Sequence, residues 1–241
     1  MVAAPGANET VYSISEKSTR RNFIDINIAG VAQLVEHFLA KEDVTSSSLV
    51  TRSIFMSNFE FVKQFNIDCN ILLDEWNKLT TRYSVFSTPK QYPRLLINHP
   101  SGYKDDIDIV NFTEQIGVQN FYQISNTFSL DNITKDFQNT YTEKVVKEVV
   151  NFLMDKYQVT VIKYAGLAPN FIMGMHKDHD LHPRFMLLVS GNDLCYMDTD
   201  DARYPINQIG GLYKLDRQQP HNPINLGTTW RIMIHFDVIP K

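Results

Sequence analysis

The sequence predicts a mainly β fold with flanking helices, and two observations carry this prediction. Six short β-like runs, separated by Gly, Pro, Asn and Asp, fill residues 158–241 with no helical pattern between them. A strongly amphipathic segment at 142–157 comes just before them and is typical of a helix packed on a sheet. Strands that follow one another without intervening helices favour a sandwich or a small barrel over a parallel sheet with crossover helices.

The region between Met56 and Tyr157 is expected to be helical and mixed. Asp68 can cap a first helix, because its carboxylate accepts hydrogen bonds from the free N–H groups of a first turn. The apolar face of this helix is Leu72, Leu73, Trp76 and Leu79. Thr140 and Glu143 have the spacing of a capping box at the start of a second helix. The apolar stripe of the second helix is Val145, Val146, Val149, Val150, Leu153 and Tyr157.

Length and composition fit a single domain, which we place at residues 56–241, with the mixed part at 56–157 and the β core at 158–241. Hydrophobic residues make up 43% of the chain, enough for a sizeable core. The net charge of −4 shows no excess of basic residues that could bind nucleic-acid phosphates, so no nucleic-acid partner is expected. With two cysteines, no secretory signal pattern and no apolar run of membrane-spanning length, we expect a cytoplasmic protein without a membrane partner.

Residues 1–55 differ in character from the rest of the chain. One amphipathic helix is predicted from Val31 to Leu39, between stretches rich in Ser, Thr and Ala. The segment 30–53, GVAQLVEHFLAKEDVTSSSLVTRS, resembles the peptide obtained when a bacterial-type tRNA gene is translated. Met56 then begins MSNFEFVKQF, which reads as a natural start. We interpret residues 1–55 as a spurious or disordered extension. The alternative is a genuine N-terminal helix with a flexible leader.

A chain that begins at Met56 is therefore expected to keep the fold and the activity of the full chain. A segment that did not evolve with the core has no reason to complement it, so the melting temperature should shift little. Thermal melting of the two chains side by side checks this. Loss of soluble expression on truncation would show that the segment belongs to the protein, as would burial of Leu34, Val35 and Phe38 against the β-rich region.

A cluster of histidines indicates a metal site. The chain has seven histidines, and five of them lie beyond residue 175. If residues 170–178 form a strand, His176 and Asp178 share one face, because side chains alternate along a strand. His221 follows a later predicted strand and sits at a turn, where its side chain can face the mouth of a barrel. Two imidazoles and one carboxylate form the facial triad of non-heme Fe(II) oxygenases.

Arg231 lies ten residues after His221, in the last predicted strand. On the interior face of a barrel its guanidinium would be a buried, unpaired charge unless an anion meets it. A carboxylate is the natural bidentate partner of a guanidinium. A co-substrate that carries a distal carboxylate and undergoes oxidative decarboxylation would supply that partner.

The HKD run that starts at His176, the distal His221 and the spaced Arg231 resemble the Fe(II)/2-oxoglutarate-dependent oxygenases. Within them, the chain is similar to the aspartyl/asparaginyl β-hydroxylase branch, because Pro169 precedes His176 by seven residues and the chain ends in RIMIHFDVIP. The similarity covers residues 157–241. It implies a double-stranded β-helix, a jelly-roll or cupin-like core.

The resemblance also implies an activity and a set of site residues. The protein would be a 2-oxoglutarate-dependent hydroxylase that uses Fe(II) and O₂. By position, the iron ligands would be His176, Asp178 and His221. Arg231 would bind the distal carboxylate of 2-oxoglutarate, and Arg184 would contact the substrate. That substrate would be a protein or peptide side chain, such as that of Asp or Asn, or a small molecule.

The chain departs from the branch at three positions. Asp178 stands where members of the branch often lack a carboxylate ligand, and Asn170 stands where the family has Gly. Met233 stands where many members of the superfamily place Ser. The wider superfamily therefore fits the sequence better than the narrower branch does.

Three other interpretations stay open. Histidines recur at every third position in one stretch, at His176, His179 and His182. They would form a zinc site if that stretch were helical, although Gly174 and Pro183 disfavour a helix there. A cupin-type metal enzyme that does not use 2-oxoglutarate would need His221 but not Arg231. A non-enzymatic jelly-roll binding module would tolerate the loss of all three ligands.

Overall fold

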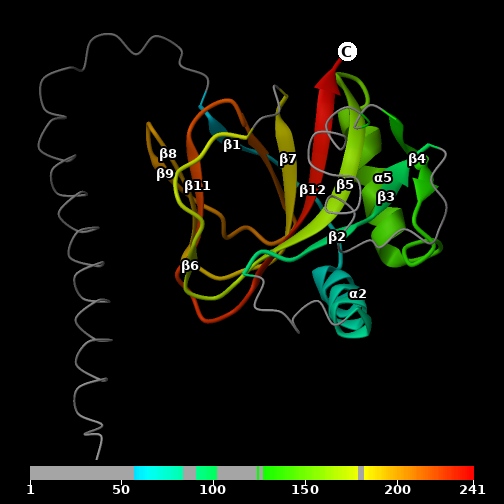
Figure 1. Cartoon of the computed structure of the whole chain (residues 1–241), viewed down its shortest axis with the longest axis horizontal. Coiled ribbons are helices and arrows are strands. Elements are labelled where there is room, and N and C mark those ends of the chain that lie inside the picture. Colours follow the sequence, from blue (N-terminus) through cyan, green and yellow to red (C-terminus); the bar gives the residue numbers. More distant parts are fainter. Residues whose placement is uncertain (1–56, 84–90, 102–123, 125–126, 179–181) are drawn as a thin grey trace, which may run out of the picture. The chain divides into compact units, whose positions relative to one another are not determined.

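The structure is a computed structural model, which describes residues 57–83, 91–101, 124, 127–178 and 182–241 (Figure 1). The predictions for residues 1–55 and for His179 lie outside these residues and stay predictions. Among the described residues, no helix has the length and apolar character needed to cross a membrane.

Two β-sheets form the centre of the fold. The large sheet has the strand order β1-β10-β7-β12-β5-β2, and the small sheet has the order β6-β11-β8-β9. The strands of the large sheet are β1 (Phe59–Gln64), β2 (Arg94–Leu96), β5 (Tyr157–Leu167), β7 (Arg184–Ser190), β10 (Gly211–Leu215) and β12 (Arg231–Pro240). Those of the small sheet are β6 (Phe171–Ile172), β8 (Cys195–Thr199), β9 (Arg203–Pro205) and β11 (His221–Asn225). A separate antiparallel pair is formed by β3 (Asn98–Pro100) and β4 (Phe128–Ile133).

The eight consecutive strands from β5 to β12 define the topology. Counted from one to eight, they take the order 6-3-8-1 in the large sheet and 2-7-4-5 in the small sheet. All their pairings are antiparallel. This arrangement is a double-stranded β-helix, a jelly roll built from two Greek keys. The predicted fold class is thereby confirmed.

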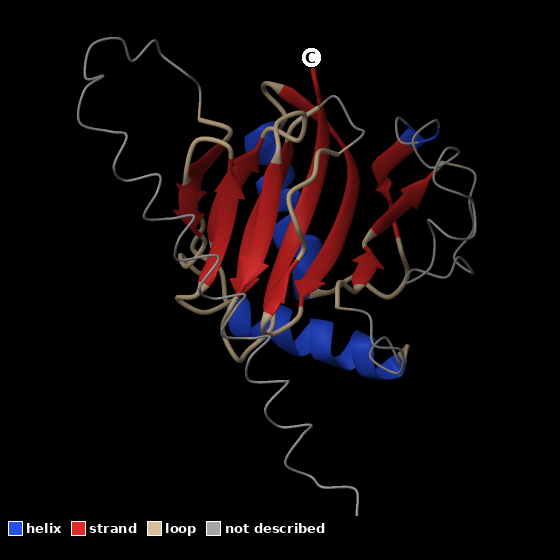
Figure 2. Ribbon diagram, turned by 60° about the vertical axis from the view of Figure 1, so that its left-hand side comes forward, coloured by secondary structure: helices blue, strands red, loops and turns tan. Residues whose placement is uncertain are grey.

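Two helices pack against the large sheet: α5 (Tyr141–Leu153) lies behind its strands and α2 (Cys69–Arg82) runs along their lower end (Figure 2). Both helices lie on the side away from the small sheet (Figure 1). Alternation along β12 divides its side chains between two environments. Four of them pack with the helices in the main apolar core: Ile232, Ile234, Phe236 and Val238. The side chains between them point into the space between the sheets: Arg231, Met233, His235 and Asp237. The interior of the jelly roll therefore receives three ionisable groups from one strand.

The predicted helix caps form as expected. The Asp68 carboxylate accepts a hydrogen bond from the N–H of Asn70, and the Thr140 hydroxyl accepts one from the N–H of Glu143. The second helix is shorter than predicted, because it ends at Leu153 and Tyr157 opens strand β5 instead. Tyr157 pairs with Pro240 and packs its ring against Phe185 at 5.1 Å between centroids. Sheet pairing thus overrides the helical spacing of this residue.

Helix α5 is also capped from outside its own sequence. Glu75, on α2, accepts hydrogen bonds from the N–H groups of Tyr141 and Thr142, both at 2.9 Å, and from the Thr142 hydroxyl at 2.6 Å. A carboxylate is favourable here, because the first turn of a helix has unpaired N–H groups and a partial positive charge. The same hydroxyl contacts the buried Tyr164 hydroxyl of β5. Glu75 therefore ties both helices to the large sheet.

Replacing Glu75 with Gln should lower the free energy of unfolding by about 1–2 kcal/mol, because the amide keeps only one acceptor oxygen and loses the charge. Urea denaturation measures this difference. Glu148→Gln is the matched control, because Glu148 lies on the exposed face of α5, the helix that Glu75 caps. Equal stability of the two variants would contradict the capping role.

Candidate metal centre

The chain brings His176 and His221 together by a backbone pairing. His176 donates its N–H to the carbonyl of His221 at 3.0 Å, and His221 donates its N–H to the carbonyl of His176 at 2.8 Å. This isolated bridge anchors the loop after β6 to the first residue of β11. Two residues on, Asp178 donates its N–H to the carbonyl of Arg217 at 3.1 Å.

The predicted strand at 170–178 is much shorter than expected. Only Phe171 and Ile172 form a strand, because Gly174 adopts a φ of +90° and turns the chain away. The hydrogen bonds of His176 and Asp178 to the opposing segment nevertheless keep their alternation. The two side chains therefore still point to the same side, as the strand pattern predicted.

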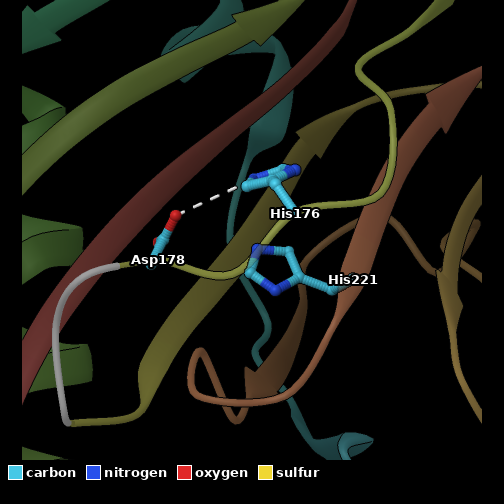
Figure 3. A group of neighbouring side chains, drawn as sticks. All are labelled: His176, Asp178 and His221. Carbon is cyan, nitrogen blue, oxygen red and sulfur yellow. Dashed lines mark ion pairs between the residues drawn. The ribbon is translucent and has the colours of Figure 1, made fainter.

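Three side chains converge at this point: His176, Asp178 and His221 (Figure 3). One potential ligand atom from each lies within 4.8 Å of the others. His176 Nε2 is 3.8 Å from Asp178 Oδ1. The centroids of the two imidazole rings are 4.4 Å apart, and the interplanar angle is 55°. A divalent ion fits such a group, because nitrogen and oxygen donors that close can share one ion.

Backbone carbonyls determine which ring nitrogen of each histidine is available to bind an ion. His176 Nδ1 lies 2.8 Å from the carbonyl of Gly174, and His221 Nδ1 lies 3.0 Å from the carbonyl of Gln219. A carbonyl only accepts, so each Nδ1 carries the proton and each Nε2 keeps its lone pair. Burial lowers the pKa of His221, which favours the neutral imidazole that binds metal.

Asp178 stays ionised because of two guanidinium groups. Arg184 Nη1 is 3.0 Å and Arg217 Nη1 is 3.8 Å from Asp178 Oδ2. Burial of the carboxyl opposes its ionisation, but these charges outweigh the effect and lower its pKa. The candidate metal centre thus offers one anionic group at neutral pH.

A second buried carboxylate, Asp237, lies behind these guanidinium groups. It pairs with Arg184 at 2.6 Å, with Lys163 at 2.9 Å and with Arg217 at 3.4 Å. Burial opposes its ionisation as well, yet the neighbouring cations hold the pKa of Asp237 well below its usual range. Burial conversely lowers the pKa of Lys163 to about 8. We call Lys163, Arg184, Arg217 and Asp237 the charge cluster.

Arg231 lies apart from the charge cluster on the same interior face of β12. The residue is 4% exposed, and among the described residues its guanidinium makes one hydrogen bond, from Nη1 to the carbonyl of Tyr196 at 3.3 Å. In the described part of the chain, no carboxylate lies within ion-pair distance of it. Burial lowers its pKa, as expected for a cation without an anionic partner. The site therefore fits a ligand that brings a carboxylate.

Besides the triad and Arg231, the residues that the sequence predicted near the site are Arg184 and the histidines His179, His182 and His235. All three nitrogens of the Arg184 guanidinium bond to Asp178 and Asp237, so its predicted substrate contact stays a prediction. The His182 carbonyl accepts a hydrogen bond from Arg217 Nε. His235 is buried, and its Nδ1 has no hydrogen-bond partner among the described residues. The zinc interpretation depends on His179, which lies outside them.

Sequence reasoning missed the charge cluster, apart from Arg184. A signal was present, because Arg231, His235 and Asp237 interrupt an apolar strand at positions of equal parity. Lys163 and Arg217 carried no comparable local signal. The role of Lys163 depends on strand register, with Asp237 opposite Arg184 and His235 opposite Lys163, whereas Arg217 lies in the connection between β10 and β11.

Fold and site together define a double-stranded β-helix protein with a candidate two-histidine, one-carboxylate metal centre. No protein-family model matches the sequence, and no curated protein does. Among solved structures, the fold is similar to a viral collagen prolyl hydroxylase of Paramecium bursaria Chlorella virus-1, described as its 2OG complex, with a TM-score of 0.44 and 11% identity over 76% of this chain and 96% of that one.

Two further solved structures are similar in part of the fold. One is an oxidoreductase of the 2OG-Fe(II) oxygenase family from Burkholderia pseudomallei, with a TM-score of 0.35 and 10% identity over 44% of this chain and 60% of that one. The other is a predicted oxalate decarboxylase from Thermotoga maritima, with a TM-score of 0.29 and 18% identity over 38% of this chain and 74% of that one.

Proposed function

We propose that the protein is an Fe(II)- and 2-oxoglutarate-dependent oxygenase. The observation that supports this best is Arg231, a buried guanidinium without a carboxylate partner among the described residues, in the jelly roll that carries the triad. The triad accounts for a metal, and Arg231 accounts for a co-substrate with a distal carboxylate. The substrate would be a protein or peptide side chain such as Asp or Asn.

The residues of the chain would divide the work as follows. His176, Asp178 and His221 would hold the ion on one side and leave its other side open. Bound Fe(II), 2-oxoglutarate and O₂ would supply the oxidising chemistry, in which 2-oxoglutarate takes up one oxygen atom of O₂ and becomes succinate and CO₂, while the other oxygen atom enters a C–H bond of the substrate. Arg231 would orient the co-substrate through a bidentate contact.

The interior between the sheets would keep water away from the reaction. Strands of both sheets contribute to a cluster of buried apolar side chains there, which includes Met186, Leu188, Met197 and Met233. A dry pocket strengthens the contact between a guanidinium and a carboxylate, and it limits side reactions.

A cupin-type enzyme that binds metal but not 2-oxoglutarate is the second candidate. The triad alone supports it as well as it supports an oxygenase. It gives no reason for a buried cation at Arg231, where an apolar residue of similar volume would avoid the desolvation of a charge. A binding module without activity leaves both the triad and Arg231 unexplained.

Succinate release tests these alternatives. The full chain is incubated with Fe(II) and 2-oxoglutarate, with and without peptides that contain Asp or Asn, and succinate is measured together with a mass gain of one oxygen atom on the peptide. An oxygenase releases succinate only when Fe(II) is present. Metal binding without succinate release would favour the cupin-type enzyme, and no metal binding would favour the binding module.

We also propose that the protein acts in a reducing, cytoplasmic setting. Cys69 and Cys195 are both free thiols, and burial raises the pKa of each, so neither is predisposed to oxidation. Fractionation of the native cell tests this proposal.

A further inference from the structure

The two carboxylate oxygens of Asp178 have different surroundings. Oδ1 lies 3.8 Å from His176 Nε2 and faces the candidate metal position, whereas Oδ2 accepts a hydrogen bond from Arg184 Nη1 at 3.0 Å. Arg217 Nη1 approaches Oδ2 at 3.8 Å. The guanidinium groups therefore determine which oxygen of Asp178 is available to an ion.

Both guanidinium groups are in turn held by Asp237. Arg184 contacts it through two nitrogens, Nε at 2.6 Å from Oδ1 and Nη2 at 3.4 Å from Oδ2. Arg217 Nη1 lies 3.4 Å from Asp237 Oδ1, and its side chain is only 2% exposed. Asp237 and Arg184 are opposite each other on β12 and β7, so backbone pairing enforces the contact.

The balance of charge adds to the effect of geometry. Among the described residues, three cationic side chains of the charge cluster meet two carboxylates, those of Asp178 and Asp237. Without Asp237, Asp178 would be the one carboxylate that these cations meet among the described residues. Buried charges are weakly screened, so Asp178 would be drawn towards the guanidinium groups and the site would repel a cation more strongly.

We propose that Asp237 is a positioning residue of the metal centre, which holds Arg184 and Arg217 so that Asp178 presents Oδ1 to the ion. The inference rests on the metal centre of the proposed function but not on the use of 2-oxoglutarate. Asp237 does not itself touch the metal position. It acts on the candidate ligand Asp178 through the guanidinium groups of Arg184 and Arg217.

Binding of Co(II) to the metal-free full chain tests the inference without any turnover. Asp237→Asn should weaken Co(II) binding about 10-fold, the lower end of the range found when a direct partner of a metal ligand is lost, because Asp237 acts on the ligand through the guanidinium groups. Its visible Co(II) spectrum should also shift towards that of Asp178→Ala, in which the ligand is absent. A purely structural role of Asp237 would change the melting temperature but not the Co(II) spectrum of the folded fraction.

Asp198→Asn is the matched control. Asp198 accepts two hydrogen bonds from Arg203, between β8 and β9. This change, like Asp237→Asn, therefore removes a carboxylate charge that pairs with a guanidinium group. Asp198 is not part of the charge cluster or the triad. Its substitution should therefore leave the affinity and the spectrum of Co(II) unchanged.

A double variant distinguishes the positioning of Asp178 from the effect of the net charge of the site. Lys163→Met combined with Asp237→Asn replaces a buried ion pair by neutral side chains, which buried sites often tolerate, and it keeps the net charge of the site. If Asp237 positions Asp178, the double variant should still bind Co(II) more weakly than the wild-type chain, and it should recover only the part of the loss that is due to charge. Recovery of wild-type affinity would show that only net charge matters and would overturn the inference.

The remaining outcomes are also decisive. Wild-type affinity and spectrum in both Asp237 variants would overturn the inference and leave the metal centre intact. No Co(II) binding by the wild-type chain would overturn both the metal centre and the inference. Weakened binding in both variants, together with a wild-type chain that never converts 2-oxoglutarate, would support the inference and refute the oxygenase.

Discussion

Replacing His221 with Ala is expected to abolish Fe(II)-dependent turnover of 2-oxoglutarate. His221 is the one member of the triad that is fully buried, and its Nε2 is freed for an ion by the bond of Nδ1 to the Gln219 carbonyl. Loss of a ligand should exceed the effect of losing a supporting residue, so metal affinity should fall more than about 100-fold. Succinate release and Co(II) titration measure the two effects separately.

His182→Ala provides the comparison for this prediction. The His182 backbone carbonyl, which accepts from Arg217, is unchanged by the substitution, and its side chain is not one of the three converging groups. The variant should keep its metal. Loss of metal in His182→Ala, with retention in His221→Ala, would favour the zinc interpretation and contradict the triad. Retention of wild-type turnover in His221→Ala would refute the assignment directly.

Replacing Arg231 with Ala should mainly raise the KM for 2-oxoglutarate. A hydrogen bond to a charged group contributes about 1.5–3 kcal/mol, which corresponds to a rise of about 10- to 150-fold. The change in kcat should be small, because the distal carboxylate is bound equally in the ground state and the transition state. Initial rates of succinate release over a range of 2-oxoglutarate concentrations measure both constants.

Arg231→Lys should recover only part of the affinity, because an ammonium cannot reproduce the two parallel hydrogen bonds of a guanidinium. Arg203→Ala removes a guanidinium that already has Asp198 as its partner, and it should leave the KM for 2-oxoglutarate unchanged. A wild-type KM in Arg231→Ala would mean that the co-substrate, if used, binds elsewhere. The cupin-type enzyme would then be the better description of the site.

Much of the fold could be predicted from local sequence patterns. The caps at Asp68 and Thr140, the apolar faces of both helices and the β-rich region all follow from spacings of two to four residues. The parity of β12 also placed Arg231 on the interior face, because the alternation of side chains along a strand does not depend on the partner strand. The juxtaposition of His176 and Asp178 follows from the same alternation.

Tertiary structure decided the rest, since it depends on which distant segments pair and in which register. Gly174 broke the expected strand, and the bridge from His176 to His221 restored the alternation across a gap of 45 residues in the sequence. Glu75 caps a helix that begins 66 residues later.

The charge cluster arises in the same way. Asp237 meets Arg184 only because β12 lies beside β7, and it meets Lys163 because β12 also lies beside β5. A local pattern marks a residue as interior or exposed, whereas the identity of its partner is set by strand order. The sequence by itself therefore determined the fold class and the chemical types of the site residues. Only strand pairing decided that the Asp178 carboxylate would be supported by a second buried carboxylate through two guanidinium groups.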